Sequence, residues 1–89
     1  MSESQATPDE LLLLGRAIRE ARTERGLGVP ELATAAGIEP NDIGDLEEGR
    51  LDPTYDLLLS IADSLSVQPS TLVLRAEAMR EGGDSHGDA

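Results

Sequence analysis

Apolar residues recur along most of the chain at steps of three and four positions, which is the period of an α-helix with one buried face. The first such set consists of Leu11, Leu14, Ile18 and Ala21. This period predicts a first helix over residues 8–25. Thr7 and Glu10 have the spacing of a capping box at its start, and Gly26 is placed to end it.

Three further helices follow from the same period and from residues that start and stop a helix. Residues 29–36 and 40–48 are predicted to form two short helices, each followed by a glycine that ends it. The clearest apolar set in the chain consists of Tyr55, Leu58, Ile61, Ala62 and Leu65. It predicts a fourth helix over residues 54–65, which Thr54 is suited to cap.

A fifth helix is predicted over residues 71–80, after a break at Gln68-Pro69-Ser70. The polar residues 1–6 and the polar, glycine-rich residues 81–89 are expected to be disordered tails. No segment of any length alternates as a strand does. The predicted fold class is all-α, with five short helices packed as one domain over residues 7–80.

The composition excludes several classes of protein. With 89 residues, of which 38% are apolar, the chain supports a single core. It contains no cysteine, which excludes a disulfide framework and a thiolate metal site. The longest apolar run, Leu11 to Leu14, is too short to cross a bilayer, and the first residues lack the features of a signal peptide. We therefore expect a cytoplasmic protein.

Residues that catalyse reactions or bind cofactors are missing or isolated. The only histidine, His86, lies in the predicted tail, and the serines have no base beside them. Asp42, Asp45 and Glu48 stand at three-residue steps, but a hard cation needs roughly six oxygens arranged around a shaped loop. We expect no enzyme activity, no metal and no cofactor.

The charge of the chain is strongly negative. Eighteen acidic residues stand against seven bases, all of them arginine, for a net charge of −11. Such a charge opposes the approach of nucleic acid or of an anionic membrane, and we expect no membrane contact. The same composition is typical of a GC-rich genome or a high-salt cytoplasm, so function and host adaptation both remain open as its cause.

Four motifs have the order and spacing of one known family. They are Leu14-Gly15-x-x-Ile18-Arg19-x-x-Arg22-x-x-x-Gly26-Leu27, Glu31-Leu32-Ala33-x-x-Ala36-Gly37-Ile38, Ile43-x-x-Leu46-Glu47-x-Gly49-Arg50, and Pro53-Thr54-x-x-x-Leu58-x-x-Ile61-Ala62-x-x-Leu65-x-Val67. Together, over about Leu11 to Leu74, they resemble the helix-turn-helix domain of the phage repressor and Cro (Xre-type) family. The resemblance implies a repressor-like fold in which the third helix lies in the major groove of DNA.

The resemblance also implies roles for individual residues. The family pairs an arginine of the first helix with the glutamate that ends the third, which implies a structural ion pair between Arg22 and Glu47. The usual polar cap of the second helix and the DNA-contacting residue after it correspond to Gly28 and Val29. Two contacts to the DNA backbone are therefore missing.

The third helix departs from the family in its charge. The base-reading positions correspond to Pro40, Asn41 and Asp45, of which Asn41 can bond to adenine and Asp45 can accept from cytosine. Arg50 is the one candidate phosphate contact on this side. The acidic face, a surface for contact with a partner or for degenerate DNA reading, comprises Glu39, Asn41, Asp42, Asp45 and Glu48.

Two further sets of residues have open interpretations. The arginines of the first helix form a loose stripe that Glu20 and Glu24 are expected to neutralise in part, which favours a solvated face. Four apolar residues lie off the predicted buried faces: Leu12, Leu13, Val73 and Leu74. They are either a candidate interface with a second copy or another partner, or apolar side chains that are simply exposed.

Two functions remain. In the first, the chain is a gene-regulatory protein that acts through a protein partner with a basic surface, as an antirepressor, an antitoxin-like protein or a DNA mimic does. In the second, it is a conventional dimeric transcriptional repressor that binds DNA. The charge of the third helix favours a protein partner and disfavours DNA. The intact family pattern favours the repressor, whose host is then halophilic or GC-rich.

Overall fold

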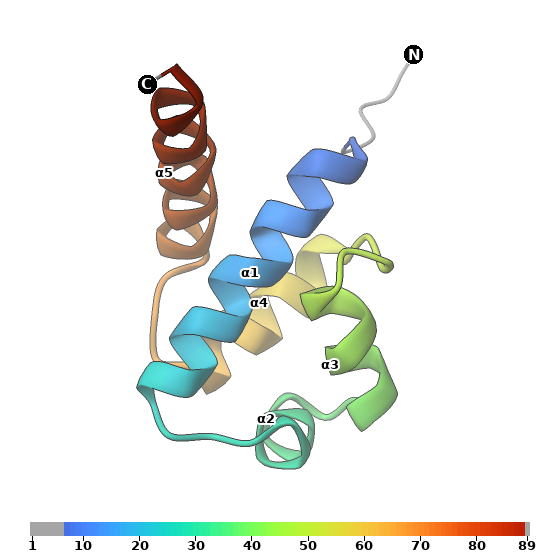
Figure 1. Ribbon diagram of the computed structural model, residues 1–89. Helices are drawn as coiled ribbons and strands as arrows, with labels where there is room; N and C mark the ends of the chain where they lie inside the picture. The colour runs from blue at the N-terminus through green and yellow to red at the C-terminus, as the bar shows by residue number, and fades with distance from the viewer. Residues whose placement is uncertain (1–6, 89) are drawn as a thin grey trace.

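The computed structural model describes residues 7–88 and their side chains as far as Arg80, and it places five helices around one core (Figure 1). The helices are α1 (Pro8–Glu24), α2 (Val29–Ala36), α3 (Pro40–Glu47), α4 (Tyr55–Ser64) and α5 (Pro69–Asp88). No strand occurs among these residues. The predicted all-α fold class is confirmed.

Side chains cap the first turns of two helices. Thr7 Oγ1 accepts from the Glu10 N–H at 3.1 Å, and the Glu10 carboxylate accepts from the Thr7 N–H at 3.0 Å, so the capping box is complete. Thr54 caps α4 by accepting from the Leu57 N–H at 3.1 Å. The glycines that follow α1, α2 and α3 have a left-handed backbone: Gly26, Gly37 and Gly49.

The last helix differs from the sequence-based prediction at both ends. It begins at Pro69 rather than residue 71, because proline fits the first turn of a helix, where its missing N–H has no partner to lose. It continues to Asp88, beyond the expected end at Arg80, since glycine raises the cost of a helix without preventing it. The disorder expected for residues 81–89 stays a prediction. The tail expected at residues 1–6 lies outside the described residues.

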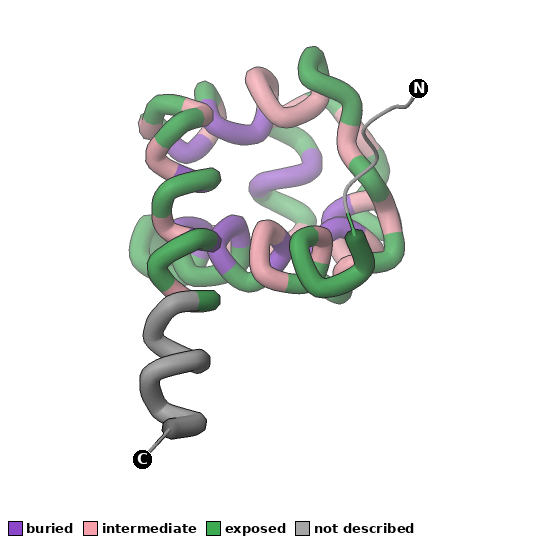
Figure 2. Tube along the Cα trace, turned by 90° about the horizontal axis from the view of Figure 1, so that it is seen from above, coloured by how far each residue is buried: buried purple, intermediate pink, exposed green. Residues whose placement is uncertain are grey.

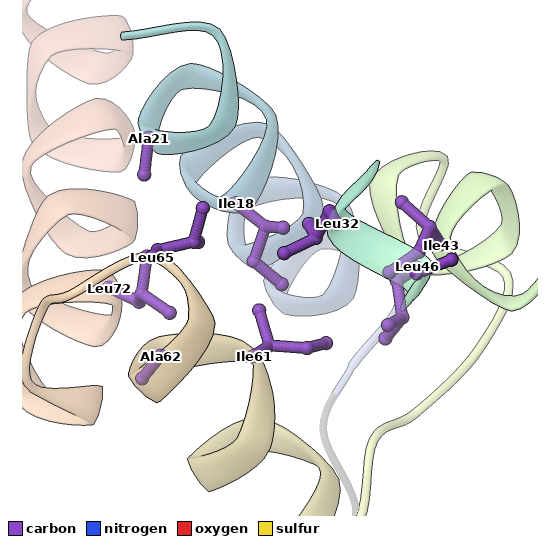
Figure 3. Close-up of a cluster of buried hydrophobic side chains, with 10 residues drawn as sticks. Ile18, Ala21, Leu32, Ile43, Leu46, Ile61, Ala62, Leu65 and Leu72 are labelled. Carbon is purple, nitrogen blue, oxygen red and sulfur yellow. The ribbon is translucent and has the colours of Figure 1, made fainter. Parts of the chain in front are cut away.

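One hydrophobic core lies between the helices, and the buried parts of the trace face inward (Figure 2). Helix α1 packs against both α3 and α5, while α2 packs against α3 and α4. Tyr55 completed the apolar period of α4 but is 71% exposed, because it lies at the edge of the apolar face in the first turn. The core side chains, most of which Figure 3 labels, are Ile18, Ala21, Leu32, Ala33, Ile43, Leu46, Ile61, Ala62, Leu65 and Leu72.

The backbones of α1 and α3 are in direct contact at Gly15. A Cβ atom at this position would lie 2.3 Å from the carbonyl oxygen of Leu46 and 2.7 Å from that of Glu47. Only glycine permits this approach, since any side chain would collide with backbone atoms. Gly15 therefore sets how closely α3 lies against the rest of the fold.

The apolar residues of the described helices were compared with what a membrane-spanning helix needs. No single described helix combines the length and the apolar character that crossing a membrane requires. Helix α4 and the first part of α5 reach that composition only as a pair, and they are bent by 95° to each other. Ile61 of α4, Leu65 directly after it and Leu72 of α5 are fully buried in the core.

Candidate functional site

Helix α3 is anchored through one side, which leaves the opposite side free to act. Ile43 and Leu46 are buried in the core. Glu47 is also buried, and it accepts two hydrogen bonds from Arg22: Nε to Oε2 at 2.6 Å and Nη2 to Oε1 at 3.0 Å. The ion pair implied by the family resemblance is thus present, with the fork geometry that favours arginine and carboxylate.

Arg22 also bonds to a group that the sequence did not indicate. Its Nη1 donates to the carbonyl oxygen of Leu27 at 2.9 Å, which ties the connection between α1 and α2 to the ion pair. The hydrogen bonds to Glu47 raise the pKa of Arg22, so the guanidinium stays charged at every working pH. The arrangement holds α1, the following loop and the end of α3 as one unit.

The acidic face of α3 lies on the side away from the core. Its members recur at three- and four-residue steps from Asn41 through Asp45 to Glu48, with Asp42 one step around the helix. Asn41, Glu48 and the preceding Glu39 are exposed, while Asp42 and Asp45 are half-buried. The structure therefore places these predicted residues on a surface that another molecule can reach.

Arg50, the candidate phosphate contact, is held by the acidic face itself. Its Nη2 lies 2.7 Å from Glu48 Oε1 and 3.4 Å from Asp45 Oδ1. Arg50 is the only basic residue in the chain between Arg25 and Arg75, so this half of the sequence offers no second cation to the face. The positive charge that would meet a phosphate is offset within the protein.

The start of α2 adds another carboxylate. Gly28 has no side chain to cap the helix, and the carboxylate of Glu31 instead accepts a hydrogen bond from the Gly28 N–H. The sequence signal for this contact was a glutamate three residues after the cap, which is the second half of a capping box. Negative charge thus stands at a position where the family resemblance implies a contact to DNA.

Glu20 and Glu24 do not neutralise the arginine stripe of α1, and that prediction was wrong. Both carboxylates face Arg75 of α5, at 3.7 Å and 3.1 Å from its Nη1. Sequence spacing along one helix could not reveal this, because the partner comes from a helix about fifty positions further on. Three arginines on this side are exposed: Arg16 and Arg19 of α1, and Arg25 directly after it.

The four surplus apolar residues do not form one patch. Leu13 and Val73 line a hollow of about 230 Å³ between α1, α5 and the residues before α4. The Glu10–Arg80 ion pair, with 3.4 Å between its nitrogen and oxygen, stands at the edge of this hollow. The other two lie apart from it: Leu12 against Gly49, and Leu74 as a 63% exposed side chain of α5.

The acids of α3 do not converge as metal ligands do. Among the residues with described placement, no three histidine, cysteine, aspartate or glutamate side chains are grouped to hold a metal ion. Asp42, Asp45 and Glu48 instead spread along the helix. The chemistry available to the acidic face is the binding of positively charged groups.

The sequence and the fold are both similar to known regulators. The family described as a helix-turn-helix domain matches residues 13–76. The chain is 37% identical over 71 residues to the HTH-type transcriptional regulator DdrOP3 of Deinococcus deserti, covering 80% of this chain and 50% of that protein. It is 42% identical over 55 residues to Multiprotein-bridging factor 1 of Candida albicans, covering 62% of this chain and 36% of that protein. The chain thus spans half or less of the length of these two relatives.

Two solved structures share the fold. The clp gene regulator ClgR from Corynebacterium glutamicum superposes with a TM-score of 0.83 at 26% identity, covering 96% of this chain and 88% of that one. The restriction-modification controller protein C.AhdI from Aeromonas hydrophila superposes with a TM-score of 0.70 at 30% identity, covering 71% of this chain and 96% of that one. With the family match over residues 13–76, these likenesses establish that the chain belongs to the helix-turn-helix domain family of gene-regulatory proteins.

Proposed function

We propose that this helix-turn-helix protein regulates gene expression chiefly through a protein partner whose basic surface binds the acidic face of α3. In this role it acts as an antirepressor, as an antitoxin-like protein or as a DNA mimic. Its place in the phage repressor and Cro branch of the family, and its location in the cytoplasm, are parts of the same proposal.

The engagement of Arg50 by Asp45 and Glu48 is the observation that carries the proposal. Proteins that bind DNA specifically neutralise several phosphates with arginine or lysine and gain affinity from the release of counterions. Here Arg50, the exposed cation that follows the recognition helix, already has carboxylate partners, and Asp42 and Asp52 add further negative charge. A basic protein surface complements this face, whereas a phosphate backbone is repelled by it.

The names of the relatives support both classes of function. Multiprotein-bridging factor 1 has a name that refers to bridging several proteins, which agrees with a partner-binding role. DdrOP3 and ClgR are named as regulators of transcription and of the clp gene. DdrOP3 and ClgR thus support a regulatory role, and the partner is what the proposal adds.

The alternative is a conventional dimeric repressor that binds DNA. The intact anchoring of α3 through Arg22 and Glu47 favours it, because the recognition helix is held in place as the family requires. A repressor of this kind needs a second copy of the chain, and the candidate apolar surface for that contact consists of Leu12, Leu13, Val73 and Leu74, of which Leu13 and Val73 line one hollow. Sedimentation of the wild type and of Val73→Asp would detect such a dimer.

A DNA-binding titration at two salt concentrations separates the two functions. We expect the wild type to bind neither random nor genomic duplex DNA at about 0.05 M or about 0.5 M salt. The variant in which Asp42, Asp45 and Glu48 are all replaced by lysine should bind duplex DNA at the lower salt only. Tight, saturable binding of the wild type to a particular duplex would overturn the proposal, and binding restricted to high salt would indicate a repressor of a halophilic host.

The same variant tests the partner. Proteins captured from the host lysate by the wild type should be basic, and the lysine variant should not capture them. A partner that the lysine variant retains does not bind through the acidic face.

A further inference from the structure

Gly44 is a described glycine for which neither packing nor backbone conformation gives a reason. Gly15 contacts the backbone of α3, and a Cβ on Gly28 would lie 2.7 Å from Glu31 Oε1. The three glycines that follow α1, α2 and α3 have a left-handed backbone. Gly44 is helical, and a Cβ built on it meets no atom within 4 Å.

The glycine weakens the helix that carries the acidic face. Within a helix, glycine is less favourable than alanine because it loses more backbone entropy on folding. Helix α3 has eight residues, and no side chain caps its first turn. So short a helix is only marginally stable by itself, and glycine lowers its stability further. Local helix propensity therefore does not explain the glycine at this position, and packing within the fold does not explain it either.

The position of Gly44 indicates what the missing side chain permits. It lies three residues after Asn41 and four before Glu48, but also three before the buried Glu47, so it stands at the border of the acidic face and is only partly exposed. The lack of a side chain leaves space over the main chain at the border of the acidic face, where a built Cβ meets no atom within 4 Å. Glycine is the residue that allows another backbone to approach closely.

We propose that Gly44 is a close-contact point at which a helix of the basic partner packs directly on the backbone of α3, with its arginines bonded to Asp45 and Glu48. This inference rests on the proposed function. Arg50 shows that one guanidinium can pair with both carboxylates at once, because its Nη2 lies within 4 Å of each of them. Arginines three or four residues apart on a second helix have the same spacing as these carboxylates.

A designed peptide serves as the probe. An alanine-based peptide of about 20 residues with arginine at every fourth position is long enough to be partly helical, and its small residues allow close packing. Calorimetric titration at about 0.05 M salt compares the wild type with Gly44→Leu and with Ala35→Leu, which adds the same side chain to an exposed position of α2. We expect Gly44→Leu to bind the peptide about tenfold more weakly and to unfold at a higher temperature, while Ala35→Leu binds as the wild type does.

Three outcomes overturn the inference. In the first, Gly44→Leu binds the peptide as tightly as the wild type; if the Asp45→Lys, Glu48→Lys variant loses binding, the proposed function stands without the contact at Gly44. In the second, Gly44→Leu unfolds at a lower temperature, which assigns the glycine to the fold. In the third, the wild type does not bind the peptide, and saturable binding of duplex DNA would then overturn the proposed function as well.

Discussion

Arg22 and Glu47 join α1 to the end of α3 through two hydrogen bonds, the shorter of which is 2.6 Å long. Only 9% of the surface of Arg22 and 7% of that of Glu47 is exposed, so both charged side chains are largely shielded from solvent. The pair lies beside the contact between Gly15 and the last turn of α3, where the two backbones touch. One small region therefore fixes the orientation of the acidic face.

Replacement of Glu47 by alanine should lower the free energy of unfolding by about 3 kcal/mol, because it leaves the Arg22 guanidinium buried without its counter-charge. Glu48→Ala removes the same charge from the next residue, which is exposed, and should change stability by less than about 1 kcal/mol. Urea denaturation of the two variants measures the difference. Equal effects would mean that the buried pair contributes nothing beyond a surface charge.

Gly15 and Gly44 should respond to alanine in opposite directions. Gly15→Ala forces a methyl group into the backbone of α3 and should destabilise the fold by about 2 kcal/mol or more. Gly44→Ala adds a methyl group where nothing lies within 4 Å and should stabilise it by up to about 1 kcal/mol. Thermal unfolding monitored by circular dichroism compares both with the wild type. A loss of stability in Gly44→Ala would contradict the assignment of that position to open space.

Local signals in the sequence predicted the helices well. The capping box of Thr7 and Glu10 and the cap formed by Thr54 depend on atoms within three residues, so the sequence contains all that determines them. The pairing of Arg22 with Glu47 spans 25 positions and came from the family resemblance, not from spacing. Without that resemblance the pair could not have been predicted.

Contacts between distant segments account for what the sequence left open. Glu20 and Glu24 face Arg75, which only the packing of α5 on α1 could bring to them. Leu13 and Val73 meet in one hollow for the same reason. The helical period showed that Leu13 and Val73 lie off the main apolar faces of their helices, but it could not show that the two residues lie together in the fold. The acidic face was predictable because one helix contains most of it.

The capping box of α1 should make part of the stability depend on pH. Hydrogen bonding to the Thr7 backbone, assisted by Arg80, lowers the pKa of Glu10 from its ordinary value of 4.5. Because the folded state holds the carboxylate charged, its contribution is complete above the unfolded pKa and is lost as pH falls through the lowered folded pKa. The difference in unfolding free energy between the wild type and Glu10→Gln should therefore be larger at about pH 6 than at about pH 3.

Glu77→Gln is the matched control for this prediction. Glu77 is an exposed carboxylate of α5 that forms no ion pair with any described residue, so its removal tests the general effect of net charge. Chemical denaturation of both variants at the two pH values provides the comparison. If the Glu10 and Glu77 variants lose stability in parallel as pH falls, net charge and not the capping box governs the pH dependence.

Replacement of Arg50 by alanine should distinguish the two proposed functions by the sign of its effect. If a basic partner binds the acidic face, removal of Arg50 frees Asp45 and Glu48 and should tighten binding of the arginine peptide. The gain should be no more than about fivefold, because the Arg50 side chain is 65% exposed and an exposed ion pair is worth at most about 1 kcal/mol.

If the chain instead reads DNA, Arg50 supplies its phosphate contact, and the same replacement should weaken duplex binding and reduce its dependence on salt. Titration of the wild type and Arg50→Ala with both the peptide and duplex DNA, at the same two salt concentrations, gives the sign directly. Arg75→Ala removes a guanidinium of the same charge from the contact between α1 and α5 and controls for net charge. Peptide binding that Arg50→Ala leaves unchanged or weakens would mean that Arg50 does not compete for the acidic face, and the protein-partner proposal would lose its main support.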